Sequence, residues 1–114
     1  MNSEAQPLDR ATAAEYASWF RALADATRVQ LVSLLARQGT PMNVGEIVAE
    51  VEVVQSTVSA HLKVLADVGF VLAEHRGTAT YYRINDECVD CFPTAADIVM
   101  ARPVPAQPAP PSRP

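Results

Sequence analysis

Two cysteine residues, Cys88 and Cys91, are the strongest candidates in this sequence for metal-binding side chains. Residues three positions apart on a helix lie on the same face, so the two sulfur atoms could approach a single ion. Thiolates favour thiophilic species, which here means As(III), Sb(III), Cd(II), Pb(II) or Zn(II). Because one chain supplies only two thiols, a third ligand would come from a second protomer, an external thiol, or a carboxylate such as Asp86 or Asp90.

Other roles for the same two cysteines remain open. Small apolar thiols at helical spacing are common in protein cores. A reversible disulfide or a sulfenate would make the pair a redox switch. An oxidoreductase is disfavoured, because the C-x-x-C motif lacks the strand-to-helix context of such sites. No nucleophile–base pair, phosphate loop or carboxylate dyad indicates any other enzyme.

A second group of candidate residues lies on the segment 55–69, which is predicted to be helical. Val58, Leu62 and Leu65 recur at positions i, i+4 and i+7 and form one apolar stripe. Gly69 would end this helix, because glycine readily adopts the left-handed conformation. Hydroxyls, an amide and a lysine suit the base edges and phosphates of a DNA groove, although an ordinary amphipathic surface helix has the same pattern. The polar residues that fall away from the stripe are Gln55, Ser56, Thr57, Ser59 and Lys63.

Three helices are predicted before this segment from the spacing of apolar residues. They are expected at 11–20, from the N-cap Asp25 to the breaker segment 38–41, and at 44–51. The link 52–54 is too short for anything but a tight turn, so the helices 44–51 and 55–69 are predicted to form a helix-turn-helix. The apolar side chains of Trp19 and Phe20 would cover either a second subunit or the domain's own core.

After the predicted helix-turn-helix, the apolar residues change from helical spacing to alternation. The segments 70–75 and 80–84 alternate with a period of two, and Gly77 lies in the turn between them, which predicts a β-hairpin. A lone hairpin is unstable in water, so it would pack on the helices as a wing. Arg76 at its tip could reach a phosphate or the minor groove, or it could be a solvated turn residue.

A last helix is predicted from about Asp86 to Met100, with Asn85 or Asp86 as its cap and a break or kink at Pro93. The segment beyond it holds six of the nine prolines and is expected to be extended and disordered. The predicted division is a flexible N-terminus at 1–10, one domain at 11–101 and a proline-rich tail at 102–114.

Composition limits the class of protein further. The chain has 114 residues, 49% of them hydrophobic and 19% charged, which fits one globular domain. Its net charge of −4 argues against non-specific coating of nucleic acid, although the segment 55–83 is mildly basic. No apolar run approaches the ~18 residues of a membrane span, and the first residues do not look like a secretory signal. A cytoplasmic location without membrane contact is therefore expected.

The predicted elements together resemble the ArsR/SmtB family of bacterial metal-responsive repressors. The resemblance rests on FRALADATR at 20–28, QSTVSAHLKVL at 55–65 and GTATYYRI at 77–84, and it covers about residues 15–100. It implies a mainly α-helical winged helix-turn-helix with a small β-hairpin. It also implies a homodimer that binds double-stranded DNA with an inverted-repeat operator, at half-sites about 34–36 Å apart. Ligand binding would release the DNA.

The resemblance assigns roles to residues by their position in the family motif. His61 is added in this way, although it could instead pack at the edge of the core. The family often has a helix-capping serine where Val54 stands and an arginine where Ala60 stands, so a cap and one phosphate contact are expected to be missing. The residues expected to contact DNA are Gln55, Ser56, Thr57, Ser59, His61, Lys63 and Arg76.

The metal sites common in this family are absent from the sequence. Arsenic repressors commonly carry two cysteines in the third helix, at positions occupied here by Asn43 and Gly45. The predicted recognition helix has no cysteine, and the last helix has no histidine. Cys88 and Cys91 remain as the predicted sensor, with arsenite or antimonite as inducer and Cd, Pb or Zn as other ions. The alternatives are a thiol-redox-responsive repressor and a winged-helix protein-interaction module with structural cysteines.

Overall fold

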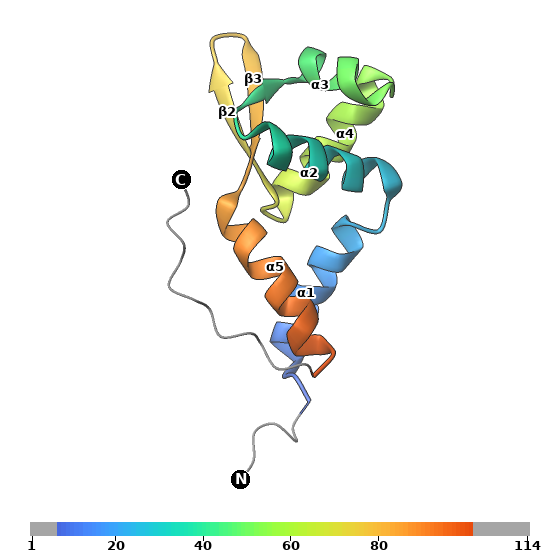
Figure 1. Cartoon of the computed structure of the whole chain (residues 1–114), viewed down its shortest axis with the longest axis vertical. Helices are drawn as coiled ribbons and strands as arrows, with labels where there is room; N and C mark the ends of the chain where they lie inside the picture. The colour runs from blue at the N-terminus through green and yellow to red at the C-terminus, as the bar shows by residue number, and fades with distance from the viewer. Residues whose placement is uncertain (1–6, 102–114) are drawn as a thin grey trace.

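The computed structural model describes residues 7–101, without the side chains of residues 88–91. The predicted tail 102–114 and most of the predicted flexible N-terminus lie outside this range. The described part of the chain holds five α-helices and three short strands (Figure 1). Their bounds are α1 Arg10–Ala22, α2 Ala26–Gln38, β1 Met42–Asn43, α3 Val44–Val51, α4 Gln55–Asp67, β2 Val71–Arg76, β3 Ala79–Ile84 and α5 Asp86–Val99.

This architecture confirms the predicted fold class, a mainly helical chain with a small antiparallel hairpin. The third helix has the predicted bounds, because a capping box joins Asn43 and Glu46 at its start. The fourth helix ends two residues before Gly69. A Schellman motif closes it, with the N–H of Phe70 bonded to the carbonyl of Leu65 at 3.0 Å and Gly69 at a φ of 89°.

The strand β1 was not predicted, and it turns the expected two-stranded wing into a three-stranded sheet. It pairs antiparallel with β3, so that Met42 lies opposite Tyr82 and Asn43 opposite Tyr81. The strand order is β1-β3-β2. Two residues are too few to show alternation in the sequence, which explains why the pattern failed here. The start of α3 is therefore bonded to the wing.

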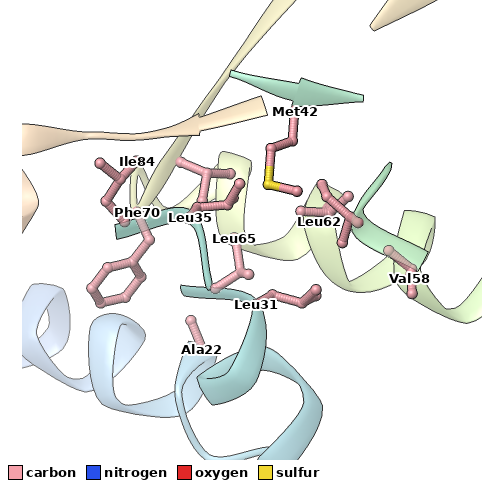
Figure 2. Packing of buried hydrophobic residues seen from close by; sticks show 11 residues of the cluster. Ala22, Leu31, Leu35, Met42, Val58, Leu62, Leu65, Phe70 and Ile84 are labelled. Carbon is pink, nitrogen blue, oxygen red and sulfur yellow. The ribbon is translucent and has the colours of Figure 1, made fainter. Parts of the chain in front are cut away.

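The hydrophobic core lies between α2, α3, α4 and the base of the hairpin (Figure 2). The predicted stripe on α4 is confirmed, since Val58, Leu62 and Leu65 are all 0% exposed. The side chains of α2 and α3 that pack against this stripe are equally buried. These partners are Leu31, Leu35 and Ile47. The opposite side of α4 is therefore the side that faces outward.

The first and last helices lie side by side below this core (Figure 1). Phe92 joins them to the domain, with ring centroids 5.3 Å from Phe20 and 5.4 Å from Phe70. Of the break or kink predicted at Pro93, the break is wrong, because α5 continues to Val99. Proline removes only one backbone donor, and the contacts of Phe92 and the burial of Ala95 hold the helix on both sides of it. No helix in residues 7–101 is long and apolar enough to span a membrane.

Candidate DNA-binding surface and sensor helix

The helices α3 and α4 are joined by a three-residue turn, as the sequence predicts. Glu52 makes this turn possible by adopting a left-handed conformation, with φ 56° and ψ 39°. Its N–H donates to the carbonyl of Val48 at 3.2 Å and so closes α3. A left-handed backbone costs a non-glycine residue about 1–2 kcal/mol. The burial of Ile47 and Val58 on either side of the turn offsets this cost.

The first turn of α4 carries no side-chain cap. Val54 is the N-cap residue, its side chain makes no hydrogen bond to the helix, and it is 67% exposed. The predicted absence of a cap is thus confirmed. The first N–H groups of α4 have no partner within the helix, as at any helix start. They lie beside the exposed side chains of Gln55 and Ser56.

The predicted DNA-contacting residues of α4 do not all share one face. At about 100° per residue, Ser56 and Lys63 lie opposite the buried stripe, and Ser59 lies on the flank next to them. Ser56 and Lys63 are exposed, and Ser59 is half-buried. Thr57 and His61 lie on the other flank, and both are half-buried.

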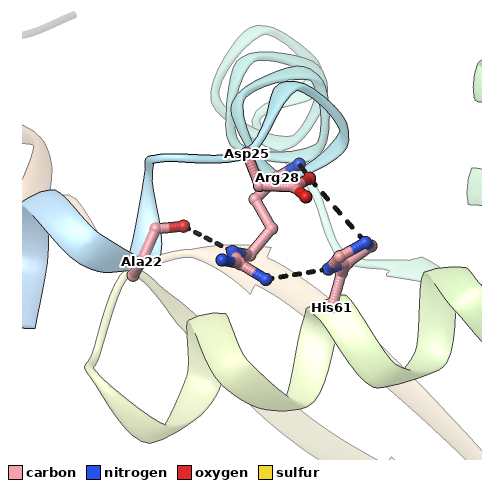
Figure 3. A network of polar contacts seen from close by, with 4 residues as sticks. All are labelled: Ala22, Asp25, Arg28 and His61. Carbon is pink, nitrogen blue, oxygen red and sulfur yellow. Dashed lines mark hydrogen bonds and ion pairs between the residues drawn. The ribbon is translucent and has the colours of Figure 1, made fainter.

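The ring of His61 faces α2 and joins a polar network there (Figure 3). The guanidinium of Arg28 lies 3.0 Å from Nδ1 of His61 and also donates through Nε to the carbonyl of Ala22 at 2.6 Å. Nε2 of His61 lies 3.7 Å from the carboxylate of Asp25, and the side chain of His61 is only 18% exposed. The network therefore connects α4 to the end of α1 and the start of α2.

The chemistry of arginine decides which atom donates and which accepts in this network. A guanidinium can only donate, so Nδ1 of His61 is the acceptor in this contact, and Nε2 faces the carboxylate of Asp25. The carboxylate of Asp25 accepts the backbone N–H of Arg28 at 3.1 Å and thereby caps α2, as predicted. This hydrogen bond lowers the pKa of Asp25 below its ordinary value. Arg28 was not singled out from the sequence, because its partner lies 33 residues away.

In the wing, Arg76 lies at the end of β2 next to the turn. Its side chain is 54% exposed, bonds Glu74 at 3.0 Å and lies over the ring of Tyr81 at 4.6 Å. Arg83 binds the other oxygen of Glu74 at 2.7 Å. The hydrogen bonds from Arg83 and then Arg76 lower the pKa of Glu74. Glu74 thus holds the guanidinium of Arg76 against the sheet and partly neutralises its positive charge.

The predicted metal ligands Cys88 and Cys91 lie in the first half of α5, and their side chains are outside the described residues. Among the side chains that the structure does describe, no group of three His, Cys, Asp or Glu residues is placed to hold a metal ion. The sensor assignment therefore stays a prediction.

The start of α5 is hydrogen-bonded to the two residues that follow the C-cap of α4. The side-chain amide of Asn85 donates to the carbonyl of Gly69 at 2.8 Å, and its backbone N–H donates to Phe70 at 3.0 Å. The side-chain oxygen of the same residue accepts the N–H of Glu87 and caps α5. Asn85 thus links the predicted sensor helix to the segment that closes the predicted recognition helix.

Comparisons with known proteins also indicate a regulatory protein. Residues 25–72 match the family model described as bacterial regulatory protein, arsR family. The chain is 38% identical over 76 residues to the "Arsenical resistance operon repressor" of Bacillus subtilis, covering 67% of this chain and 71% of that one. It is 37% identical over 84 residues to the "Probable mercury resistance operon repressor" of Streptomyces lividans, covering 74% and 61%.

Among solved structures, a "homodimeric winged helix-turn-helix DNA-binding domain" from Mycobacterium bovis superposes with a TM-score of 0.66 at 30% identity. The match covers 83% of this chain and 89% of that one. The fold and the polar face of α4 define a winged helix-turn-helix DNA-binding regulator. The chain belongs to the ArsR/SmtB family of transcriptional regulators, which is not a family of enzymes.

Proposed function

We propose that this chain is a cytoplasmic, homodimeric, metal-responsive repressor that releases an inverted-repeat operator when arsenite or antimonite binds Cys88 and Cys91. The observation that carries the proposal is the pair of hydrogen bonds from Asn85, the N-cap of α5, to Gly69 and Phe70, the residues that follow the helix with the proposed DNA-binding face. The names of the relatives support a metal or metalloid as the signal, and they differ in which one, arsenic or mercury.

For DNA binding, the proposal assigns the outward face of α4 to the major groove. Ser56 and Ser59 would donate to or accept from base edges, and Lys63 would bind a phosphate. Gln55 and Thr57 would complete the contacts at the start of the helix. Arg76 would contact the backbone or minor groove from the wing, after exchanging Glu74 for a phosphate.

His61 enters this proposal as a positioning residue. Its ring is turned towards α2, and the flank that carries it points away from Ser59. Its two nitrogen atoms are both engaged, one with Arg28 and the other facing Asp25. We therefore assign it to holding α4 at a fixed angle on α2, so that the outward face meets the groove.

For release, a ligand bound to the two thiols would change how α5 packs. Residues at i and i+3 of a helix share one side, so the two thiols could bind one ion, and three-coordinate As(III) would take a further ligand from the partner subunit, a carboxylate or an external thiol. Movement of α5 would pull on Gly69 through Asn85 and on Phe70 through Phe92. The two recognition helices of the dimer would then leave their one-turn spacing.

The test is an anisotropy titration on the duplex recovered with highest affinity from a randomised pool. The buffer contains a phosphine reductant, because a thiol would compete for the metalloid. Arsenite is expected to release the wild-type protein, whereas Cys88→Ser and Cys91→Ser should bind the duplex normally and not release it. Thr94→Ala, on the same helix with both thiols intact, is the matched control. Release of both cysteine variants by arsenite would place the sensor elsewhere.

The same binding assay, with other reagents, distinguishes the alternative functions. A thiol-redox repressor would be released by diamide and recaptured by the phosphine, without a response to arsenite. Parallel titrations with Cd(II), Pb(II), Zn(II), Sb(III) and Hg(II) rank the inducers. A protein-interaction module would select no duplex from the pool and show no salt-dependent binding below micromolar concentration, which would contradict the repressor function itself.

A further inference from the structure

Val54 is a feature that the folding of the domain does not explain. Outside α5 and its C-cap, it is the most exposed large hydrophobic side chain of the described residues, at 67%. Val53 beside it packs against the core, whereas Val54 does not. A branched apolar side chain in water contributes nothing to the core.

The backbone at this position is built for a capping residue. Its φ of −62° and ψ of 150° are those of an N-cap, and its carbonyl accepts the N–H of Val58 at 3.0 Å. Serine, threonine, asparagine or aspartate here would bond the free N–H groups of the first turn. Valine cannot form these hydrogen bonds, so α4 is uncapped and an apolar side chain is exposed at its start.

The position of Val54 indicates what that apolar group contacts. It directly precedes Gln55 and Ser56 at the N-terminal end of α4, and in helix-turn-helix proteins this end of the recognition helix meets base edges. The one apolar group that a base pair presents in the major groove is the 5-methyl group of thymine. The neighbours Glu52, Gln55 and Ser56 are polar and exposed, so the apolar surface is about the size of one methyl contact and too small for a protein partner.

We propose that Val54 is a specificity-determining residue that recognises a thymine methyl group in each operator half-site. This inference rests on the proposed DNA-binding function and deepens it. It assigns the base contact to the residue at which the chain departs from the serine common in its family.

The experiment replaces each thymine of the pool-selected duplex by deoxyuridine, which removes only the methyl group. At one position in each half-site, wild-type protein is expected to bind about fourfold more weakly, the factor for removing one methyl group from an apolar contact. Val54→Ala should bind the thymine and uracil duplexes equally. Val64→Ala, which trims an exposed valine further along the same helix, is the matched control and should keep the full fourfold loss.

A second variant separates recognition from stability. Val54→Ser restores the cap and should raise the melting temperature, yet it should also lose the difference between thymine and uracil. The inference is overturned if deoxyuridine weakens wild-type binding at no position, or if Val54→Ala and Val54→Ser keep the same loss. Failure to select any duplex would instead refute the DNA-binding function, so the two failures are distinguishable.

Discussion

The two nitrogen atoms of His61 face neighbours of opposite charge, and this arrangement decides what the residue can do. Arg28 requires an acceptor at Nδ1, and Asp25 attracts the proton on Nε2. A ring engaged in this way is not available to a base edge. It also leaves the guanidinium of Arg28 partly buried, with its second bond to the carbonyl of Ala22 at the end of α1.

Replacing His61 by phenylalanine keeps the ring volume and removes the acceptor for Arg28. We expect the free energy of unfolding to fall by about 1–2 kcal/mol, because a hydrogen bond to a charged group is lost at a half-buried site. Urea unfolding measures this. His75→Phe, at an exposed histidine on the wing, is the control and should change stability by less than about 0.5 kcal/mol.

DNA selection with the same variant distinguishes positioning from recognition. If His61 holds α4 in place, His61→Phe should weaken binding to all duplexes in proportion and select the same sequence as wild type. A changed base preference would show that His61 contacts a base directly.

Among the elements, the wing depends on charge pairs around one carboxylate. Glu74 on β2 accepts from Arg83 across the hairpin and from Arg76 near the tip. Its pKa is lowered from the ordinary value of 4.5, mainly by these hydrogen bonds. The folded state therefore holds its proton less tightly than the unfolded state.

This difference sets the direction of a pH effect. The stabilisation from Glu74 is fully present above about pH 4.5 and is lost as the pH falls through the lower folded-state pKa. In thermal melts, the melting temperature of Glu74→Gln should therefore fall less than that of wild type as the pH is lowered from about 5 to about 3. Glu50→Gln, at an exposed carboxylate on α3, should follow the wild-type profile. Parallel profiles for all three proteins would contradict the role of Glu74.

Local patterns predicted the elements well, and contacts between distant residues poorly. The bounds of α3 and the buried stripe of α4 follow from spacing and caps, which act within a few residues. The strand β1 is too short to show a pattern, and Pro93 is tolerated because Phe92 finds partners from other elements. The bond between Arg28 and His61 spans 33 residues, so no local rule could predict which way His61 turns.

At the scale of the whole molecule, the path proposed for the signal from α5 to the end of α4 is short. α5 begins where the sheet ends, and Asn85 bonds both its own helix and Gly69, two residues after the end of α4. The aromatic contacts of Phe92 with Phe20 and Phe70 run parallel to this bond. A displacement of α5 would thus reach the end of the DNA-binding helix by two routes, through Asn85 and through the buried ring of Phe70.

Two substitutions at Asn85 test this path. Asn85→Asp keeps the oxygen that caps α5 and loses the donor to the carbonyl of Gly69, whereas Asn85→Ala loses both. If the bond to Gly69 transmits the signal, both variants should bind the operator and both should need at least about tenfold more arsenite for release. A normal response of Asn85→Asp would show that the aromatic contacts alone are sufficient.

The pairing of β1 with the middle of β3 has a practical consequence for redesign. It anchors Tyr81 and Tyr82 to the start of α3, while the tip residues 76–79 pair only with one another. The two turn residues between Arg76 and Ala79 can therefore be varied in length and charge without changing the part of the wing that is bonded to α3. Retargeting the protein to operators with a different flanking sequence should be possible from the tip alone, without rebuilding the helices.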